Sequence, residues 1–165
     1  MYYEKVFKVF QKLKVKYFVG GGLAVNLYGV PRFTQDIDII IDVSPANLER
    51  LQKAFKALGY RPRVSISMQD FLNPGNWEKR KREKGMIALN LYHPKEPYQE
   101  IDLLVNVPLS YEKAKKRAVF ARSGSLKVNL VGLADLIEMK KTAGRAQDKS
   151  DILALRKIKK FKEKL

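Results

Sequence analysis

The 165-residue chain contains no cysteine and a single histidine, His93. The absence of cysteine excludes a disulfide framework and a thiolate metal site, and it favours a reducing compartment. No apolar run is long enough to cross a bilayer, and the N-terminal segment alternates charged with apolar residues, unlike a signal peptide. We therefore expect a cytoplasmic protein without a membrane partner. His93 has no second histidine as a co-ligand and is expected to be a surface residue in a turn.

Acidic residues are scarce relative to basic ones: 17 Asp and Glu stand against 33 Lys and Arg, and the formal net charge is +16. The excess is concentrated in residues 78–84, 113–117 and 140–165, the last of which hold ten basic and three acidic residues. Such a surface attracts polyanions and releases counterions when they bind, so RNA or DNA is an expected partner. A thermophilic type of lysine-rich surface is the alternative, although such surfaces usually gain Glu together with Lys.

The stretch from residue 17 to residue 42 carries the strongest chemical signal. A short apolar strand is followed by a glycine run that includes Gly21 and Gly22, and then by a helix of roughly two turns. In the next strand Asp36 and Asp38 alternate with isoleucines. Side chains alternate along a strand, so these two carboxylates project together, about 6–7 Å apart. Like charges held side by side are unfavourable unless a cation lies between them.

This combination predicts phosphate chemistry. A helix start without side chains offers backbone N–H groups and the positive end of the helix dipole to an anion. Closely spaced carboxylates suit Mg²⁺, which leaves its other positions to phosphates and water. Each half alone also has a structural interpretation, as a tight turn and as the solvated face of a strand. Together they favour a site for a nucleoside triphosphate with Mg²⁺ or Mn²⁺.

The same residues resemble a known family. Gly21-Gly22, thirteen intervening residues and Asp36-Ile37-Asp38 look like the signature of the DNA polymerase β-like nucleotidyltransferase superfamily. The fuller pattern is similar to its AbiEii-type branch, which includes minimal nucleotidyltransferases and bacterial toxins. The resemblance implies an α/β (α+β) nucleotidyltransferase fold, with a small mixed β-sheet flanked by helices and a C-terminal helical segment. We expect a single domain, with the catalytic sheet core at about residues 15–131 and C-terminal helices at about residues 133–165.

A third carboxylate is expected from the strand predicted at residues 99–105, where Glu100 and Asp102 share one face. An acid in an otherwise apolar strand is costly to bury unpaired, and a solvated edge strand is the structural alternative. The resemblance implies that Asp102 joins Asp36 and Asp38 as catalytic residues and metal ligands and helps to deprotonate the attacking hydroxyl. Glu100 is the second choice for this role.

Residues 131–152 are similar to a second signature of the same branch: a helix ending in lysine, a Gly-Arg turn and a helix that opens with Asp-x-x-Asp. The resemblance implies that Lys140 approaches the nucleotide phosphates, while Arg145, Asp148 and Asp151 shape or close the pocket. The structural alternative, in which both aspartates cap the helix and pair with Arg145, has equal weight.

The loop before the acidic strand supplies two more candidate nucleotide-binding residues, Arg32 and Thr34. Arg32 would offset phosphate charge in the transition state, whereas bracing of the turn is the structural alternative. At the second loop position the family often has serine, whose hydroxyl can touch phosphate. Gly22 leaves only backbone donors there.

The remaining elements follow from periodicity and capping residues. Helices are expected at residues 2–14, 45–58, 110–117 and 133 onward, and strands at about residues 60–66, 86–92, 119–122 and 126–130. Residues 67–85 are the least interpretable part, with a turn at residues 73–76 and a loop beyond it. There Trp77 either anchors the loop on the core, which we favour, or stacks on bases. The final helix has an apolar stripe expected to be buried, made up of Ile152, Leu155, Ile158 and Phe161.

The expected function is therefore Mg²⁺-dependent transfer of a nucleoside monophosphate from a triphosphate to a hydroxyl acceptor, with tRNA or other RNA as a candidate acceptor. One alternative is a catalytically inactive protein of this fold that binds RNA or a partner protein. Another is a small-molecule adenylyltransferase of the antibiotic-modifying kind. The acceptor, the preferred base, the oligomeric state and an antitoxin-type partner stay open. Larger family members carry a further helical domain, so the acceptor site here is minimal or completed by a second subunit.

Overall fold

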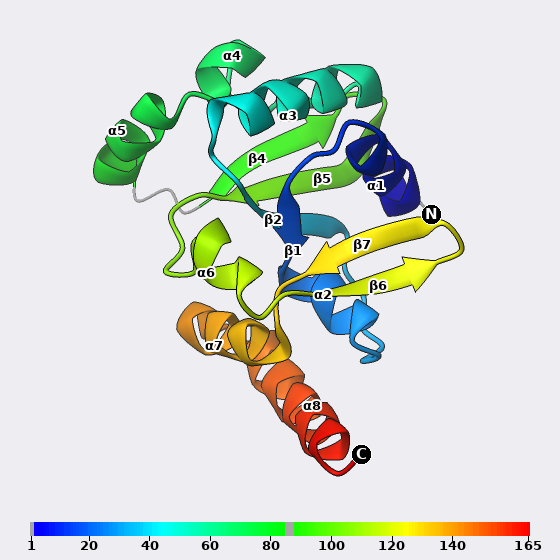
Figure 1. The fold of residues 1–165 in the computed structure, drawn as a ribbon. Coiled ribbons are helices and arrows are strands. Elements are labelled where there is room, and N and C mark those ends of the chain that lie inside the picture. Colours follow the sequence, from blue (N-terminus) through cyan, green and yellow to red (C-terminus); the bar gives the residue numbers. More distant parts are fainter. Residues whose placement is uncertain (1, 85–87) are drawn as a thin grey trace.

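A seven-stranded mixed sheet forms the centre of the computed structural model, which describes residues 2–84 and 88–165 (Figure 1). The strand order is β3-β4-β5-β2-β1-β7-β6. The strands are β1 (Tyr17–Val19), β2 (Asp36–Ile41), β3 (Arg61–Pro62), β4 (Ala88–His93), β5 (Glu96–Leu104), β6 (Val119–Ser123) and β7 (Leu126–Leu130). The helices are α1 (Tyr2–Lys12), α2 (Gly21–Leu27), α3 (Pro45–Leu58), α4 (Met68–Phe71), α5 (Pro74–Lys84), α6 (Tyr111–Lys115), α7 (Leu133–Ala143) and α8 (Ala146–Glu163).

The sheet has two differently used faces. Strand β2 runs antiparallel to β1 and parallel to β5, and β1 runs parallel to β7. Helices α1 and α3 cover one face, while α2, α6 and α7 lie on the other (Figure 1). The predicted α/β class with a mixed sheet flanked by helices is confirmed.

On the face under α1, Tyr17 stacks on Phe7 with ring centroids 5.5 Å apart and meets Phe10 edge-on at 5.1 Å. Because such aromatic pairs add packing energy beyond the area that they bury, this face forms the main core.

The connection from β2 to α3 shows why the acidic strand ends where it does. Helix α3 begins after Ser44 and ends at Gly59, whose φ of 82° is left-handed, so the predicted helix is confirmed. Asn47 is fully buried, and its amide donates to the carbonyl oxygens of Asp42 (2.7 Å) and Lys16 (2.9 Å). This side chain fixes the end of β2 against the start of α3 because each buried polar group of the amide finds a partner.

Two expectations about the segment after α3 are wrong. The strand expected at residues 60–66 is only Arg61–Pro62, because proline has no N–H to donate to a ladder and is confined to sheet edges. The turn expected at residues 73–76 instead starts α5, with Pro74 at the first helical position, where a missing N–H costs nothing. Trp77 is buried and its indole N–H donates to the Phe71 carbonyl at 2.8 Å. The interpretation of Trp77 as an anchor is confirmed.

Three further expectations are adjusted. Residues 86 and 87 of the predicted strand lie outside the described residues. His93 is half-buried and meets Tyr60 edge-on at 5.6 Å, so it is not a plain surface residue. In α8, Leu155 is buried, but Phe161 is 65% exposed and the predicted buried stripe is wrong at that end. The helix packs on α7, and its last turns extend away from the sheet, with Lys162 Nζ 5.2 Å from the centre of the Tyr28 ring (Figure 1).

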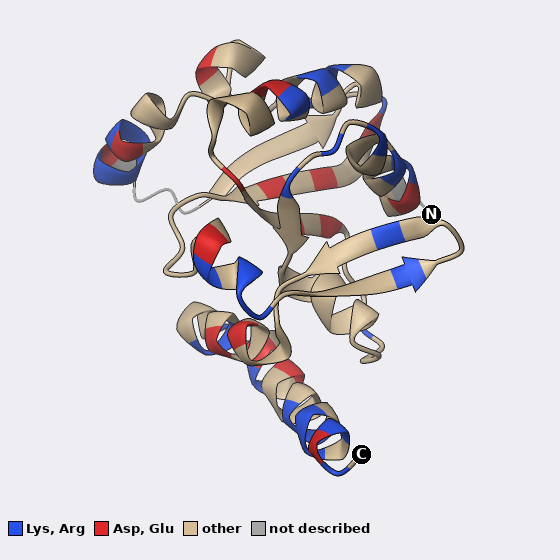
Figure 2. Cartoon of the chain, viewed as in Figure 1, with Lys and Arg blue, Asp and Glu red and all other residues tan. Residues whose placement is uncertain are grey.

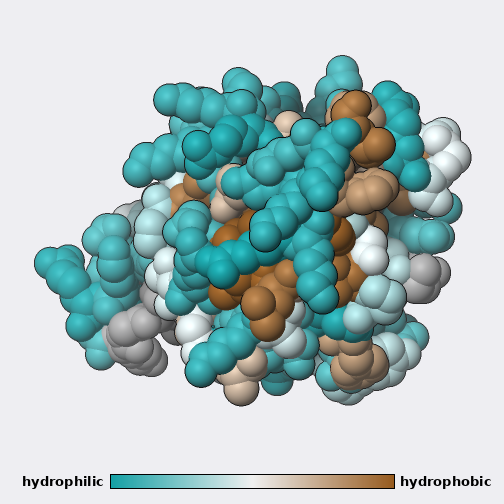
Figure 3. All heavy atoms as spheres, turned by 90° about the horizontal axis from the view of Figure 1, so that it is seen from below, coloured by the Kyte–Doolittle hydropathy of each residue, from teal (hydrophilic) through white to brown (hydrophobic). Residues whose placement is uncertain are grey.

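The exposed part of α8 contributes to a mixed surface. The face seen from below in Figure 3 has apolar side chains near its centre, bordered by hydrophilic ones. Leu153 is another exposed apolar residue of α8, with 62% of its surface accessible. No described helix combines the length and the apolar character needed to span a membrane.

Candidate active site

The three predicted carboxylates meet on the sheet face opposite the main core. In the parallel pairing of β2 with β5, Asp38 lies directly beside Asp102 and Asp36 beside Glu100. Neighbouring strands are about 4.8 Å apart, so paired side chains on one face are close neighbours. The alternate residues of β2, Ile37 and Ile39, are fully buried toward the other face. Strand alternation therefore separates the acids from the core and gathers them into one group.

Asp102 is held by a neighbour on β4. Asn90 pairs with Asp102 in the antiparallel ladder, and its amide donates to Asp102 Oδ1 at 2.6 Å and to Glu100 Oε2 at 3.1 Å. Arg63 forms an ion pair with Glu100 and donates from Nε to Asn90 Oδ1 at 2.5 Å. Glu100 is thus neutralised by an arginine. Asp102 instead accepts a hydrogen bond from a neutral amide on one oxygen and forms no ion pair with a described residue, which favours it over Glu100 for the third-carboxylate role.

The carboxylates raise one another's pKa. Burial raises the pKa of Asp38 to about 6, and the charges of Asp102 and Asp36 add to that rise. Burial is also the main cause of the raised pKa of Asp36, followed by the charges of Asp102 and Glu100. The pKa of Asp102 is raised by burial, which outweighs the hydrogen bond from Asn90. Three acids with raised pKa values on one face form a site that a cation would stabilise.

The glycine loop packs directly on this group. Gly21 has a left-handed φ of +57°, and a Cβ added to it would lie 1.7 Å from Asp38 Oδ2. The N–H of Gly20 donates to the Asp38 carbonyl at 2.9 Å. A side chain at position 21 would have to displace the carboxylate. Glycine is therefore required here both by the backbone conformation and by the close approach.

Gly22 has a different reason to be small. A Cβ on Gly22 would lie 2.7 Å from Thr34 Oγ1 and 3.2 Å from Arg32 Cζ. The Thr34 hydroxyl lies where a side chain at position 22 would project, so a hydroxyl donor is present beside the loop although the loop itself has none. The N–H of Arg32 donates to the side-chain oxygen of Asn26 at 2.9 Å, which fixes the loop against α2.

The second signature forms a buried ion cluster beside the site. Lys140 Nζ lies 2.8 Å from Asp148 Oδ1 and 2.9 Å from Asp151 Oδ2, and Arg32 also pairs with Asp151. Lys140, Asp148 and Asp151 are 8%, 3% and 2% exposed. Although burial works in the opposite direction, hydrogen bonds from Lys140 and Gln147 hold the pKa of Asp151 below its usual value. Both aspartates are thus paired with cations, and the cluster joins α7, α8 and the Arg32 loop.

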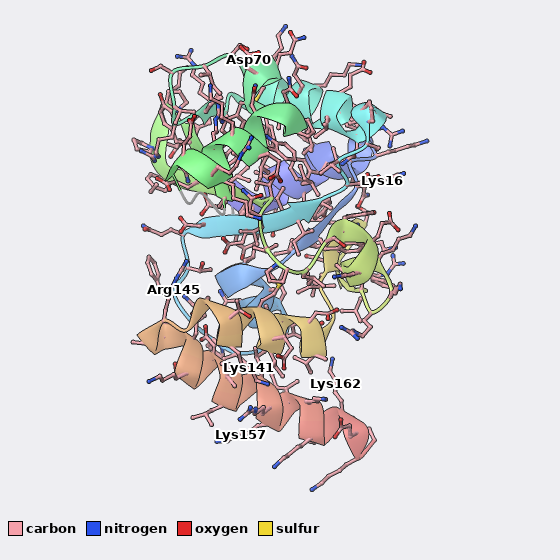
Figure 4. All side chains as sticks on the ribbon, turned by 90° about the vertical axis from the view of Figure 1, so that its left-hand side faces the viewer. Lys16, Asp70, Lys141, Arg145, Lys157 and Lys162 are labelled. Atoms are coloured by element: carbon pink, nitrogen blue, oxygen red, sulfur yellow. The ribbon has the colours of Figure 1, made fainter. Side chains whose placement is uncertain are left out.

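Arg145 takes a different position. Its backbone N–H donates to Asp148 Oδ2 at 3.0 Å, which caps α8. In Figure 4 it lies where α7 meets α8, on the side of these helices that faces the sheet. Its positive charge lowers the pKa values of Asp36, Asp38 and Asp102. Of the second-signature residues, Lys140 lowers the pKa of Asp38 more than Arg145 does, whereas Arg145 is exposed and acts on all three acids.

The carboxylates of this face are candidate ligands for a divalent cation. In residues 2–84 and 88–165, no three His, Cys, Asp or Glu side chains are already grouped tightly enough to hold a metal. Mg²⁺ requires only one or two protein carboxylates when substrate phosphates and water complete its shell. Asp36 and Asp38 supply hard oxygen ligands whose mutual repulsion a cation would relieve. The residues therefore fit a Mg²⁺ ion that arrives with a nucleotide.

The sequence interpretation missed two polar residues of this site, Asn90 and Arg63. Asn90 lies between the buried Leu89 and Leu91 on β4. A polar residue at an alternate position in an apolar strand is the signal that would have placed it on the carboxylate face. Arg63 lies in the segment expected to be a strand at residues 60–66, and nothing in that segment indicates that it pairs with Glu100.

With the fold and this geometry established, comparison with known proteins identifies the family. A family model described as aminoglycoside-2''-adenylyltransferase matches residues 3–95, which is more than half of the chain. The chain belongs to this family. This nucleotidyltransferase also resembles the lincomycin-bound lincosamide antibiotic adenylyltransferase LnuA, with a TM-score of 0.61 and 17% identity over 93% of this chain and 94% of that chain.

A second similar structure is that of an assumed nucleotidyltransferase from Thermotoga maritima. Its TM-score is 0.56 at 18% identity, covering 93% of this chain and 88% of that chain. At these identities the two structures support the fold alone. No curated protein sequence matches the nucleotidyltransferase significantly. The coarse prediction of a nucleotidyltransferase enzyme is confirmed, whereas the AbiEii-type branch stays a prediction.

Proposed function

We propose that this nucleotidyltransferase uses Mg²⁺ or Mn²⁺ to transfer a nucleoside monophosphate from a nucleoside triphosphate to a hydroxyl acceptor. The observation that carries the proposal is the juxtaposition of Asp38 and Asp102 across β2 and β5, with raised pKa values and no ion-pairing cation of their own among the described residues. Structural acids elsewhere in the chain, such as Asp148 and Asp151, are paired with cations.

In this proposal each residue has a separate task. Asp36 and Asp38 would hold the metal, which when bound polarises the phosphoryl group and stabilises the attacking and leaving oxygens. Gly21 and Gly22 leave the start of α2 open, so that phosphate oxygens can approach the backbone N–H groups. Arg145 offsets the charge that develops on the phosphates.

Asp102 accepts the proton of the acceptor hydroxyl. The hydroxyl oxygen bonds to the α-phosphorus, the bond to the β-phosphate oxygen breaks, and pyrophosphate leaves. Asn90 donates to Asp102 Oδ1 and so directs the remaining oxygen toward the hydroxyl. Burial raises the pKa of Asp102, which makes it a better proton acceptor than a solvated aspartate.

The acceptor separates two candidate functions. The net charge of +16 favours RNA, including tRNA, because a basic surface attracts a polyanion. The family description and the likeness to LnuA favour adenylyl transfer to a small antibiotic. A neutralising antitoxin-type partner stays a prediction from the sequence resemblance.

The test is transfer of label from each α-labelled nucleoside triphosphate to tRNA, to an aminoglycoside and to a lincosamide, with and without Mg²⁺. We expect Mg²⁺-dependent labelling of one acceptor class, and loss of labelling in Asp38→Asn. Asp42→Asn, just beyond the end of the same strand, is the matched control and should keep activity. Labelling that persists in excess chelator, or in Asp38→Asn, would overturn the proposal.

A further inference from the structure

A groove of about 650 Å³ opens at the sheet edge beside the carboxylate face. It lies between β3 and β4 and the helices α3 and α4, and its size is in the range of small-ligand sites. The polar and charged side chains in its lining are those of Gln52, Lys56, Arg61, Arg63, Ser65 and Ser67. The candidate nucleotide site lies apart from this groove, so the groove has no task in the chemistry described above.

Two hydrogen bonds link the wall of the groove to Asp102, the proposed base. Arg63, in its wall, lies over the ring of Tyr92 at 5.1 Å and donates to Asn90 Oδ1 at 2.5 Å. Asn90 in turn donates to Asp102 at 2.6 Å. Tyr92 and Asn90 are alternate residues on β4, so they are about 7 Å apart along the strand. The wall of the groove is therefore hydrogen-bonded, through Arg63 and Asn90, to the proposed base.

The charge of the groove is entirely basic. No Asp or Glu is among the described residues that line it. Arg63 is paired with Glu100, whereas Lys56 and Arg61 are exposed and form no ion pair with a described residue. The two unpaired cations repel another cation and attract an anion.

Basic charge continues beyond the groove along α5. The indole of Trp77 pins α5 to the end of α4, which lines the groove. Helix α5 carries the basic run 79–82, and Figure 2 shows this part of the helix mostly in blue, beyond the first turn that follows α4. A ligand with several negative charges would therefore meet basic side chains both inside the groove and next to it.

We propose that this groove binds the acceptor of the nucleotidyltransferase and selects one that carries phosphate groups, rather than a polycationic aminoglycoside. The transfer step rests on the proposed function, whereas binding in the groove does not. The end of an RNA strand and a free nucleotide share the required chemistry, a hydroxyl group next to phosphates. The aminoglycoside class, with several protonated amines, is disfavoured by Lys56 and Arg61.

The binding test uses the variant Lys56→Gln/Arg61→Gln and a fluorescently labelled, short single-stranded oligoribonucleotide. The matched control is Lys157→Gln/Lys159→Gln, which removes the same charge from the exposed face of α8. Each phosphate neutralised on a single strand contributes about 0.7 to the slope of log K against log salt. We expect the slope to fall by about 1.4 in the groove variant and to stay unchanged in the control. An unchanged slope in the groove variant, or an equal fall in both, would overturn the proposal.

Transfer assays with different acceptors then distinguish a failure of this proposal from a failure of the proposed function. Wild-type protein and both variants are assayed for transfer from a labelled triphosphate to the oligoribonucleotide, to a free nucleotide and to an aminoglycoside. Preferred labelling of either phosphate-bearing acceptor, with KM for that acceptor raised only in the groove variant, supports the proposal and identifies the source. Efficient labelling of the aminoglycoside by the wild type overturns it and leaves the proposed function intact. If no acceptor is labelled, the proposed function fails. The slope of log K against log salt for the oligoribonucleotide then decides by itself whether the groove binds phosphate groups.

Discussion

Replacing Asp38 with asparagine is expected to stabilise the fold while it abolishes nucleotidyl transfer. Burial together with the charges of Asp102 and Asp36 raises the pKa of Asp38 from 3.8 to about 6. A rise of that size corresponds to about 3 kcal/mol of unfavourable free energy for the charged form at neutral pH. Asparagine keeps the shape of the side chain but removes the charge. The variant should therefore gain up to about 3 kcal/mol at pH 7, or roughly 6–12 °C in Tm for a chain of this length.

The stability gained by Asp38→Asn over the wild type should depend on pH. The folded-state pKa is raised, so the stabilising contribution of protonated Asp38 is fully present below pH 3.8 and is lost as the pH rises through about 6. The advantage of Asp38→Asn over the wild type should accordingly be large at pH 7 and small below pH 3.8. Urea unfolding at both pH values, followed by circular dichroism, measures the difference directly.

Asp42 provides the control for this measurement. It lies just beyond the end of the same strand, and although burial opposes it, hydrogen bonds from Ser44 and Lys16 lower its pKa. Asp42→Asn should lower stability at pH 7, the opposite of Asp38→Asn. The reasoning is refuted if Asp38→Asn loses stability at pH 7, or if its gain is the same at both pH values.

Three further substitutions test other parts of the structure. Gly21→Ala should lose triphosphate binding and more than about 1 kcal/mol of stability, because the added methyl group meets Asp38 and the backbone is left-handed; calorimetric titration with a triphosphate and Mg²⁺ checks the first effect. Lys140→Met should cost about 3–5 kcal/mol in urea unfolding, because it leaves buried Asp148 without its cation and Asp151 with Arg32 alone; an unchanged unfolding midpoint would contradict the structural role of the cluster. Trp77→Phe should cost about 1 kcal/mol through the lost bond to Phe71, and hydrogen exchange in α5 should accelerate while α3 stays protected.

The parts of the fold that could be predicted are those in which local sequence and tertiary structure agree. The alternation of acids and isoleucines in β2 is visible in the sequence because one face is buried in the core and the other carries the site. Gly59 ends α3 for a purely local reason, its left-handed conformation. Helix α5 was missed because its charged run has no apolar stripe, and Trp77 is its one buried side chain among those described.

The candidate site required information that no local pattern contains. The sequence shows that Asp36 and Asp38 share a face, but the order of strands decides that β5 lies beside β2, with Asp102 next to Asp38. The resemblance to nucleotidyltransferases supplied that order as an expectation. Asn90 was missed because its partner belongs to another strand, and a register cannot be read from one strand alone.

Asp148 and Asp151 are paired with cations, whereas the three acids of the candidate active site form no ion pair with a described residue. This difference indicates which cation is free to bind phosphate. Asp148 and Asp151 are paired with Lys140 and Arg32, so the cluster of two cations and two anions carries no formal net charge. Lys140, nearly buried between two carboxylates, is therefore a weaker candidate for phosphate binding than its place in the signature suggests. Arg145, which is exposed and whose charge acts on all three unpaired acids, is the stronger one. Arg145→Gln should accordingly raise KM for the triphosphate with little change in stability. Lys140→Met should mainly lower stability. Equal effects of the two substitutions on KM, with both proteins folded, would contradict this division of roles.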